Sequence, residues 1–179
     1  MLEEYLAGEE ATITVMPPSP ERPEHWSTLP VSRYNHADGI APYNGVVAVT
    51  ANSCVATEED MKDPAYGKVM KECEQVAKLI GATAPIRIDV RRFHEGSGFA
   101  IFDINMKPVS YAPLLVYIRR NDTNNHQNMT GPGRPGREDQ ASLTAMATAA
   151  MGWDYGTLLQ KILASAQLLS TFRAYRSPF

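Results

Sequence analysis

The hydrophobic and polar residues of this chain repeat with two different periods. Three stretches alternate between apolar and polar positions and predict β-strands, over residues 10–15, 86–92 and 99–105. Three others repeat apolar residues at spacings of three and four and predict helices, over 58–80, 141–151 and 155–166. Gly81 and Gly152 are suited to end the first two helices. This mixture predicts an α+β fold, with an antiparallel sheet backed by helices.

The residues that follow the first predicted strand are mostly polar and turn-rich. Five prolines within 16–30 predict a loop there, because proline cannot donate to a strand ladder. Residues 33–45 are also polar and rich in turn formers, and a short apolar run follows over 46–49.

The last two predicted strands form a hairpin, since 94–98 (HEGSG) is a turn sequence. Centring the turn on Gly96 predicts four cross-strand pairs, namely Phe93 with Phe99, Arg91 with Ile101, Asp89 with Asp103, and Arg87 with Asn105. Arg87, Asp89, Asp103 and Asn105 then share one face of the hairpin. The other face, predicted to be the core face, carries Ile86, Ile88, Val90, Ala100, Phe102 and Ile104.

The paired carboxylates of Asp89 and Asp103 suggest a metal site. Directly opposed residues have Cβ atoms about 5 Å apart, where like charges repel. Mg²⁺ prefers oxygen ligands and would remove the conflict, with Asn105 adding a neutral oxygen. The alternative is a solvated outer face on which Arg87 and Arg91 neutralise the two carboxylates, and spacing alone favours that alternative.

Composition and charge narrow the class of protein. Of the 179 residues, 44% are hydrophobic and 21% are charged, a mixture typical of globular rather than disordered proteins. A net charge of −3 argues against a general nucleic-acid binder. The sequence has no apolar run of membrane-spanning length, and its acidic start is unlike a signal peptide. We therefore predict a cytoplasmic protein that binds neither nucleic acid nor membrane.

Four segments together resemble a known superfamily. RIDV (87–90), FDIN-x-x-P (102–108) and NMTGPGRPG (128–136) are similar to the metal-binding strands and substrate loop of ATP-grasp ligases. LEEYLAGEEATITV (2–15) is similar to the adenine-gripping hinge strand of the D-alanine–D-alanine ligase branch. The resemblance runs from Leu2 to about Ala166 and implies the C-terminal ATP-grasp subdomain. It also implies that 1–179 is a partial domain truncated at its N-terminus, because the chain starts at the hinge strand.

The resemblance implies a role for each matched residue. The nucleotide side comprises Glu3, Tyr5 and Leu6 at the adenine and Glu10 at the ribose hydroxyls. The implied ligands of Mg²⁺ (or Mn²⁺) are Asp89, Asp103 and Asn105, with Asp103 standing where the family more often has Glu. The implied catalytic residues are Arg87 at the transferred phosphoryl group, Asn128 near the developing oxyanion and Ser142 at the substrate carboxylate.

The implied reaction uses ATP to activate a small carboxylate as an acyl phosphate, which an amine then attacks. The partners are thus ATP and small carboxylate and amine substrates. A homodimer is an open alternative to a monomer. As a fragment of such a ligase, the chain is expected to have impaired activity. The alternative is a non-catalytic remnant of the fold, which we favour over turnover for this chain alone.

Two further segments allow more than one interpretation. Residues 109–127 interrupt the family pattern between FDIN-x-x-P and the substrate loop. Their codons can supply splice donor, branch and acceptor sequences, so we favour a retained intron over a surface insertion. Residues 131–137 (GPGRPGR) resemble an AT-hook, which would bind the minor groove of DNA. The acidic residues that follow, Glu138 and Asp139, argue against that role.

Overall fold

The structure of the chain is a computed structural model, and it describes residues 4–34, 52–106, 142–168 and 170. Its strands are β1 (Glu10–Met16), β2 (Trp26–Ser27), β3 (Val31–Arg33), β4 (Ser53–Val55), β5 (Ile86–Arg92) and β6 (Phe99–Asn105). Its helices are a short 3-10 turn (Asp60–Lys62), α1 (Pro64–Leu79), α2 (Leu143–Ala150) and α3 (Tyr155–Ala164). The predicted hairpin strands have the observed bounds. The other predicted elements agree to within two residues, except that α1 begins at Pro64 rather than at residue 58.

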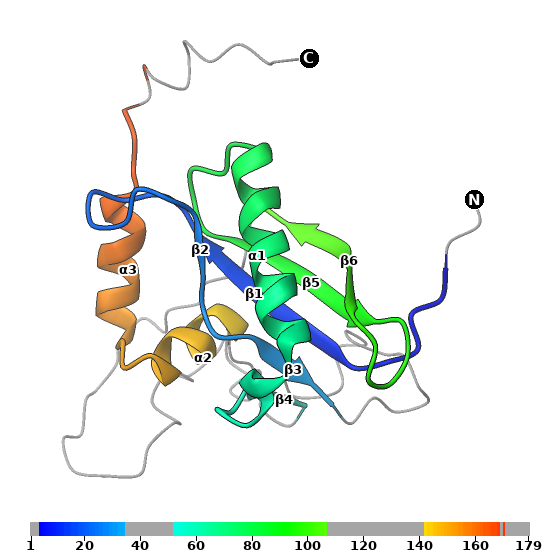
Figure 1. Cartoon of the computed structure of the whole chain (residues 1–179). Coiled ribbons are helices and arrows are strands. Elements are labelled where there is room, and N and C mark those ends of the chain that lie inside the picture. The colour runs from blue at the N-terminus through cyan, green and yellow to red at the C-terminus, as the bar shows by residue number, and fades with distance from the viewer. Residues whose placement is uncertain (1–3, 35–51, 107–141, 169, 171–179) are drawn as a thin grey trace, which may run out of the picture.

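The strands form one antiparallel sheet in the order β4-β3-β1-β5-β6, with β2 paired to the end of β1. β1 is therefore central, and it pairs with β3 on one side and β5 on the other. The loop predicted over 16–30 contains β2, whose two residues are too few to give a periodic signal. The expected α+β fold, an antiparallel sheet with helices, is thus present (Figure 1).

Helix α1 covers one face of the sheet (Figure 1). Its buried residues are Tyr66, Val69, Cys73 and Ala77, and they pack against alternate residues of β1 and β5, namely Ala11, Ile13, Val15, Ile86, Ile88 and Val90. Asp63 begins the helix by accepting a hydrogen bond from the Ala65 amide at 2.8 Å. At the other end of the helix Gly81 adopts a φ of 63°, which only glycine adopts at little cost.

Helices α2 and α3 lie against the opposite face, at the end of β1 nearest β2. Met16 packs with Ala145 of α2 and Leu158 of α3, and Val31 of β3 packs with further α2 residues. Thr14 and Thr144 join β1 to α2 by a hydrogen bond of 3.0 Å between their hydroxyls. The sheet thus lies between α1 on one face and α2 and α3 on the other, and the α2 face carries the even-numbered residues of β1.

Within the described residues, no helix is long and apolar enough to cross a membrane.

The register of the β5–β6 hairpin differs from the prediction near the turn. Arg87↔Asn105 and Asp89↔Asp103 are paired as predicted, but Val90 pairs with Ile101, Arg91 with Ala100 and Arg92 with Phe99. The predicted pairs of Phe93 with Phe99 and Arg91 with Ile101 were wrong, because a bulge between Asp89 and Val90 leaves Phe102 as an extra residue of β6.

The bulge also corrects the predicted core face of β6. Phe99 is buried and Ile101 packs against the α1 core, whereas Phe102 is exposed to 49%. Ala100 and Phe102 therefore do not form the core face, because one added residue reverses the alternation beyond it. The β5 half of the prediction was right, since Ile86, Ile88 and Val90 are all fully buried.

Candidate functional site

The sheet face opposite α1 carries a row of polar residues on three neighbouring strands. Alternation places these residues together, and we call them the inner-face site: Glu10 and Thr12 of β1, Arg87, Asp89 and Arg91 of β5, and Asp103 and Asn105 of β6. In the register, Thr12 is paired with Asp89 and Glu10 with Arg91. Asp89 thus lies between Thr12 on one side and Asp103 on the other.

The carboxylate of Asp89 is buried, with 5% of the residue exposed. The Thr12 hydroxyl donates to Oδ1 at 2.7 Å, and Arg87 Nη2 donates to Oδ2 at 3.1 Å. Both oxygens therefore have a protein donor, and the guanidinium charge offsets the carboxylate charge in a buried setting. The alternative to a metal site was a solvated face on which arginines neutralise the carboxylates. One part of it is observed, because Arg87 neutralises Asp89. The other part is not, because Asp89 is buried rather than solvated.

Asp103 and Asn105 lie on β6, the last strand in the order β4-β3-β1-β5-β6. Asp103 is exposed and Asn105 is half-buried. In the described parts of the chain, no three or more His, Cys, Asp or Glu residues gather into a group that could hold a metal ion. A cation on this face would therefore need a neutral oxygen such as that of Asn105 beside the two carboxylates.

Glu10 is buried between arginines of both neighbouring strands. It is paired with Arg91 on β5 and with Arg33 on β3. Arg91 Nη1 lies 3.8 Å from Glu10 Oε2, and Arg91 Nε donates to the carbonyl oxygen of Gly8 at 3.0 Å. Arg91 thus connects the Glu10 carboxylate to the segment that leads into β1, rather than to Asp89 or Asp103 as the outer-face alternative had it.

The segment before β1 runs beside β5. The amides of Ala7 and Gly8 donate to the carbonyl oxygens of Phe93 and Arg92, at 3.1 and 3.0 Å. Of the predicted adenine-facing residues, Tyr5 is 61% exposed and Leu6 is half-buried. Glu3 lies outside the described residues.

Ser142 directly precedes α2, which begins at Leu143, two residues after the start of the helix predicted over 141–151. Its hydroxyl accepts a hydrogen bond from the Ala145 amide at 3.3 Å, so it is the N-cap of that helix. Asn128 and the segments 109–127 and 131–137 lie outside the described residues.

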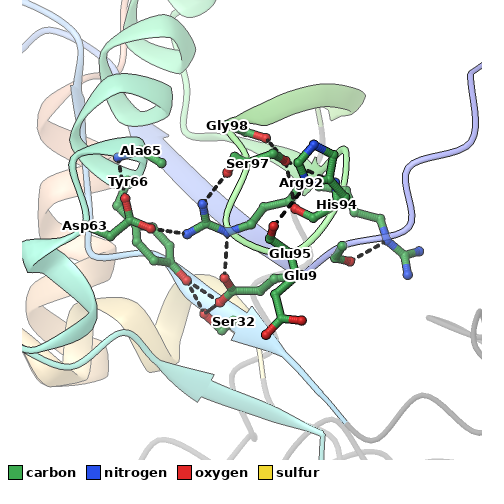
Figure 2. Close-up of polar contacts among 12 residues, drawn as sticks. Glu9, Ser32, Asp63, Ala65, Tyr66, Arg92, His94, Glu95, Ser97 and Gly98 are labelled. Carbon is green, nitrogen blue, oxygen red and sulfur yellow. Dashed lines mark hydrogen bonds and ion pairs between the residues drawn. The ribbon is translucent and has the colours of Figure 1, made fainter.

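The α1 face carries a second polar cluster, centred on Arg92 (Figure 2). The Arg92 guanidinium donates to Glu9 at 2.9 Å, to Asp63 at 2.6 Å and to the carbonyl oxygen of Ser97. It also lies 4.1 Å from the ring centre of Phe99. This cluster joins the segment before β1, the start of α1 and the hairpin turn, so its geometry indicates a structural role.

The same cluster shifts the pKa values of Tyr66 and Asp63. Burial, together with a hydrogen bond to Glu9, raises the pKa of the Tyr66 hydroxyl well above its usual range. A hydrogen bond from the Ala65 amide, and then one from Arg92, lower the pKa of Asp63. Tyr66 therefore stays protonated and Asp63 stays ionised at neutral pH.

Sequence reasoning did not single out Thr12, Arg33 or the cluster around Arg92. The alternating pattern of 10–15 places Thr12 and Glu10 on one face, but their contacts depend on which strand lies next to β1. That pairing joins residues 77 positions apart, as in the bond between Thr12 and Asp89. Local sequence carries no signal for it.

No protein-family model matches this chain, and no curated protein sequence matches it either. Among solved structures, the chain is similar to the crystal structure of D-alanine–D-alanine ligase from Bacillus anthracis complexed with ATP. The two are 14% identical with a TM-score of 0.49, and the match covers 98% of this chain. This chain spans 42% of the length of that ligase chain.

Proposed function

We propose that this chain forms the nucleotide- and metal-binding part of an ATP-dependent carboxylate–amine ligase of the ATP-grasp superfamily, of the D-alanine–D-alanine ligase type. One observation carries the proposal. The register of β5 and β6 sets Asp89 opposite Asp103 and Arg87 opposite Asn105, on one face of the sheet. These are the residues that the RIDV and FDIN motifs contribute in the family that the sequence resembles.

The donor set of the inner-face site fits a hard divalent cation. Two carboxylates and one amide oxygen on adjacent strands are the ligand types that Mg²⁺ and Mn²⁺ prefer. We assign Asp89, Asp103 and Asn105 as the residues that would hold the ion. Each oxygen of Asp89 keeps a second acceptor position after accepting from Thr12 or Arg87. When bound, the ion would neutralise charge on the phosphates of ATP.

Each remaining residue of the site has a role in the proposed reaction. Arg87 lies beside Asp89, and its fixed positive charge would bind the phosphoryl group during transfer. Glu10 would accept hydrogen bonds from the ribose, held in place by Arg91. The backbone of Tyr5 and Leu6 would contact the adenine, as would Glu3.

On the substrate side, the Ser142 hydroxyl would contact the carboxylate, and Asn128 would lie near the developing oxyanion. In the proposed reaction the substrate carboxylate attacks the γ-phosphoryl group of ATP and releases ADP. An amine then displaces phosphate from the acyl phosphate.

Calorimetric titration with a non-hydrolysable ATP analogue tests the proposal. We expect the wild-type chain to bind the analogue in the presence of Mg²⁺ and not in its absence. We expect Asp103→Asn to bind the analogue no better with Mg²⁺ than without it. Glu95→Gln is the matched control, because it removes an exposed carboxylate from the same hairpin at its turn. Absence of nucleotide binding at any Mg²⁺ concentration would contradict the proposal.

A phosphate-release assay on the wild-type chain and Asp103→Asn distinguishes an active ligase from a non-catalytic remnant. A remnant would bind the analogue with Mg²⁺ but would release no phosphate from ATP in the presence of small carboxylates and amines. Release of phosphate that stops in Asp103→Asn would support the ligase.

A further inference from the structure

The buried position of Thr12 could be filled by an apolar side chain of the same shape, yet the hydroxyl of Thr12 makes a specific contact. Thr12 is 1% exposed and lies in the central strand, where a valine would fit the same space. Its Oγ1 donates to Asp89 Oδ1 at 2.7 Å, and this buried carboxylate is also paired with Arg87. Such charge-assisted bonds are roughly twice as strong as neutral ones.

The bond controls the direction of the carboxylate. Thr12 holds Oδ1 from β1 while Arg87 holds Oδ2 at 3.1 Å from within β5. Two donors on two different oxygens fix the rotation of the carboxylate plane about its bond to the side chain. Asp103 is paired with Asp89 from the other side, on β6. Thr12 and Asp103 therefore flank Asp89 across three strands.

We propose that Thr12 is a positioning residue, which aims the Asp89 carboxylate at a divalent cation shared with Asp103 and Asn105. The inference rests on the proposed function, because it takes these three residues as the ion's ligands. Partners that orient metal ligands in this way typically change metal affinity by about 10- to 100-fold when they are removed.

The chain offers a matched set of variants. Thr12→Val keeps the shape of the side chain and removes the hydroxyl, and Thr12→Ser restores the hydroxyl in the same place. Thr14→Val is the control, because Thr14 is an equally buried threonine of β1 whose hydroxyl bonds to Thr144 of α2 instead. A purely structural loss would be similar for the two valine variants.

Mn²⁺ titration followed by electron paramagnetic resonance, with a non-hydrolysable ATP analogue present, gives the affinity without any turnover. We expect Thr12→Val to weaken Mn²⁺ binding about tenfold or more, with Thr12→Ser and Thr14→Val close to wild type. Equal affinity in Thr12→Val and wild type would overturn the proposal, as would equal weakening in Thr14→Val.

Metal-free crystal structures of the same variants separate this proposal from the proposed function. If the wild type binds no Mn²⁺, the proposed function fails at this site, and the positioning role is then judged from the carboxylate alone. An Asp89 side chain that rotates in Thr12→Val and keeps its direction in Thr12→Ser supports the role. An unchanged direction in Thr12→Val overturns it.

Discussion

Arg87 and Asp89 are two residues apart on β5, and their side chains form a buried ion pair of 3.1 Å on the inner face of the sheet. Both side chains are less than 15% exposed, at 14% and 6%. The charge of Asp89 is therefore largely shielded from water, and Arg87 offsets it at close range.

Removing one member of this pair should destabilise the fold. We expect Arg87→Met to lower the free energy of unfolding by about 3 kcal/mol, since it leaves the Asp89 carboxylate buried beside the Thr12 hydroxyl and without the charge of Arg87. Urea titration of Arg87→Met, Asp89→Asn and the double variant measures the coupling. Losses that simply add in the double variant would contradict the pairing.

Gly8 should not tolerate a side chain. A Cβ at this position would lie 2.6 Å from Arg92 Cβ and 2.9 Å from the carbonyl of His94, which is too close for either to remain in place. We expect Gly8→Ala to cost about 1–3 kcal/mol in thermal or urea unfolding.

Gly67 of α1 is the matched control for Gly8, because a Cβ there meets no atom within 4 Å. Alanine is the better helix former, so Gly67→Ala should stabilise the protein by about 0.5–1 kcal/mol. Equal effects of the two substitutions would show that the close approach at Gly8 is absent.

Arg92 should matter more than an exposed ion pair. Its guanidinium bonds to Glu9 and packs 4.1 Å from the ring centre of Phe99, with 6% of the side chain exposed. We expect Arg92→Met to cost about 2–3 kcal/mol in urea unfolding. Lys62→Ala removes the exposed pair of Lys62 with Glu59, and it should cost less than about 0.5 kcal/mol. A similar small loss in Arg92→Met would contradict the structural role of the cluster.

The N-cap of α3 should contribute to acid unfolding. Hydrogen bonds from the side chain and backbone of Thr157 lower the pKa of Asp154 in the folded protein. Its contribution is thus present above the unfolded pKa of about 3.9 and is lost as the pH falls through the lower folded pKa.

Asp154→Asn separates the cap from its charge. Asparagine is also a good N-cap, so stability at pH 7 should change little, whereas the loss of stability between pH 5 and pH 2 should become smaller. Urea unfolding at each pH measures the slope. An unchanged slope would contradict the ionised cap.

The sequence predicted the elements better than it predicted their contacts. Strong alternation located β5 and β6. Centring the turn on Gly96 put the register wrong by one residue beside the turn, and the bulge restores the predicted pairing of Asp89 with Asp103. The bulge at Phe102 was not predictable, because an extra residue in one strand leaves no mark on local periodicity. β3 and β4 were missed because strands of three residues are too short to show a period.

Of the candidate site, local patterning placed Asp89, Asp103, Arg87 and Asn105 together. It did not reveal that Asp89 is buried, or that Thr12 bonds to it, because both depend on β1 pairing with β5. Pairing between distant strands is decided by the packing of whole faces, here those against α1 and α2, rather than by neighbouring residues.

The two neighbours Glu9 and Glu10 serve opposite sides of the sheet, and so do Arg91 and Arg92. Each acid of the first pair meets one base of the second. Inserting or deleting a single residue just before Thr12 would move each glutamate to the opposite side of the sheet and separate it from its present arginine. The length of the segment from Gly8 to Thr12 should therefore tolerate no change.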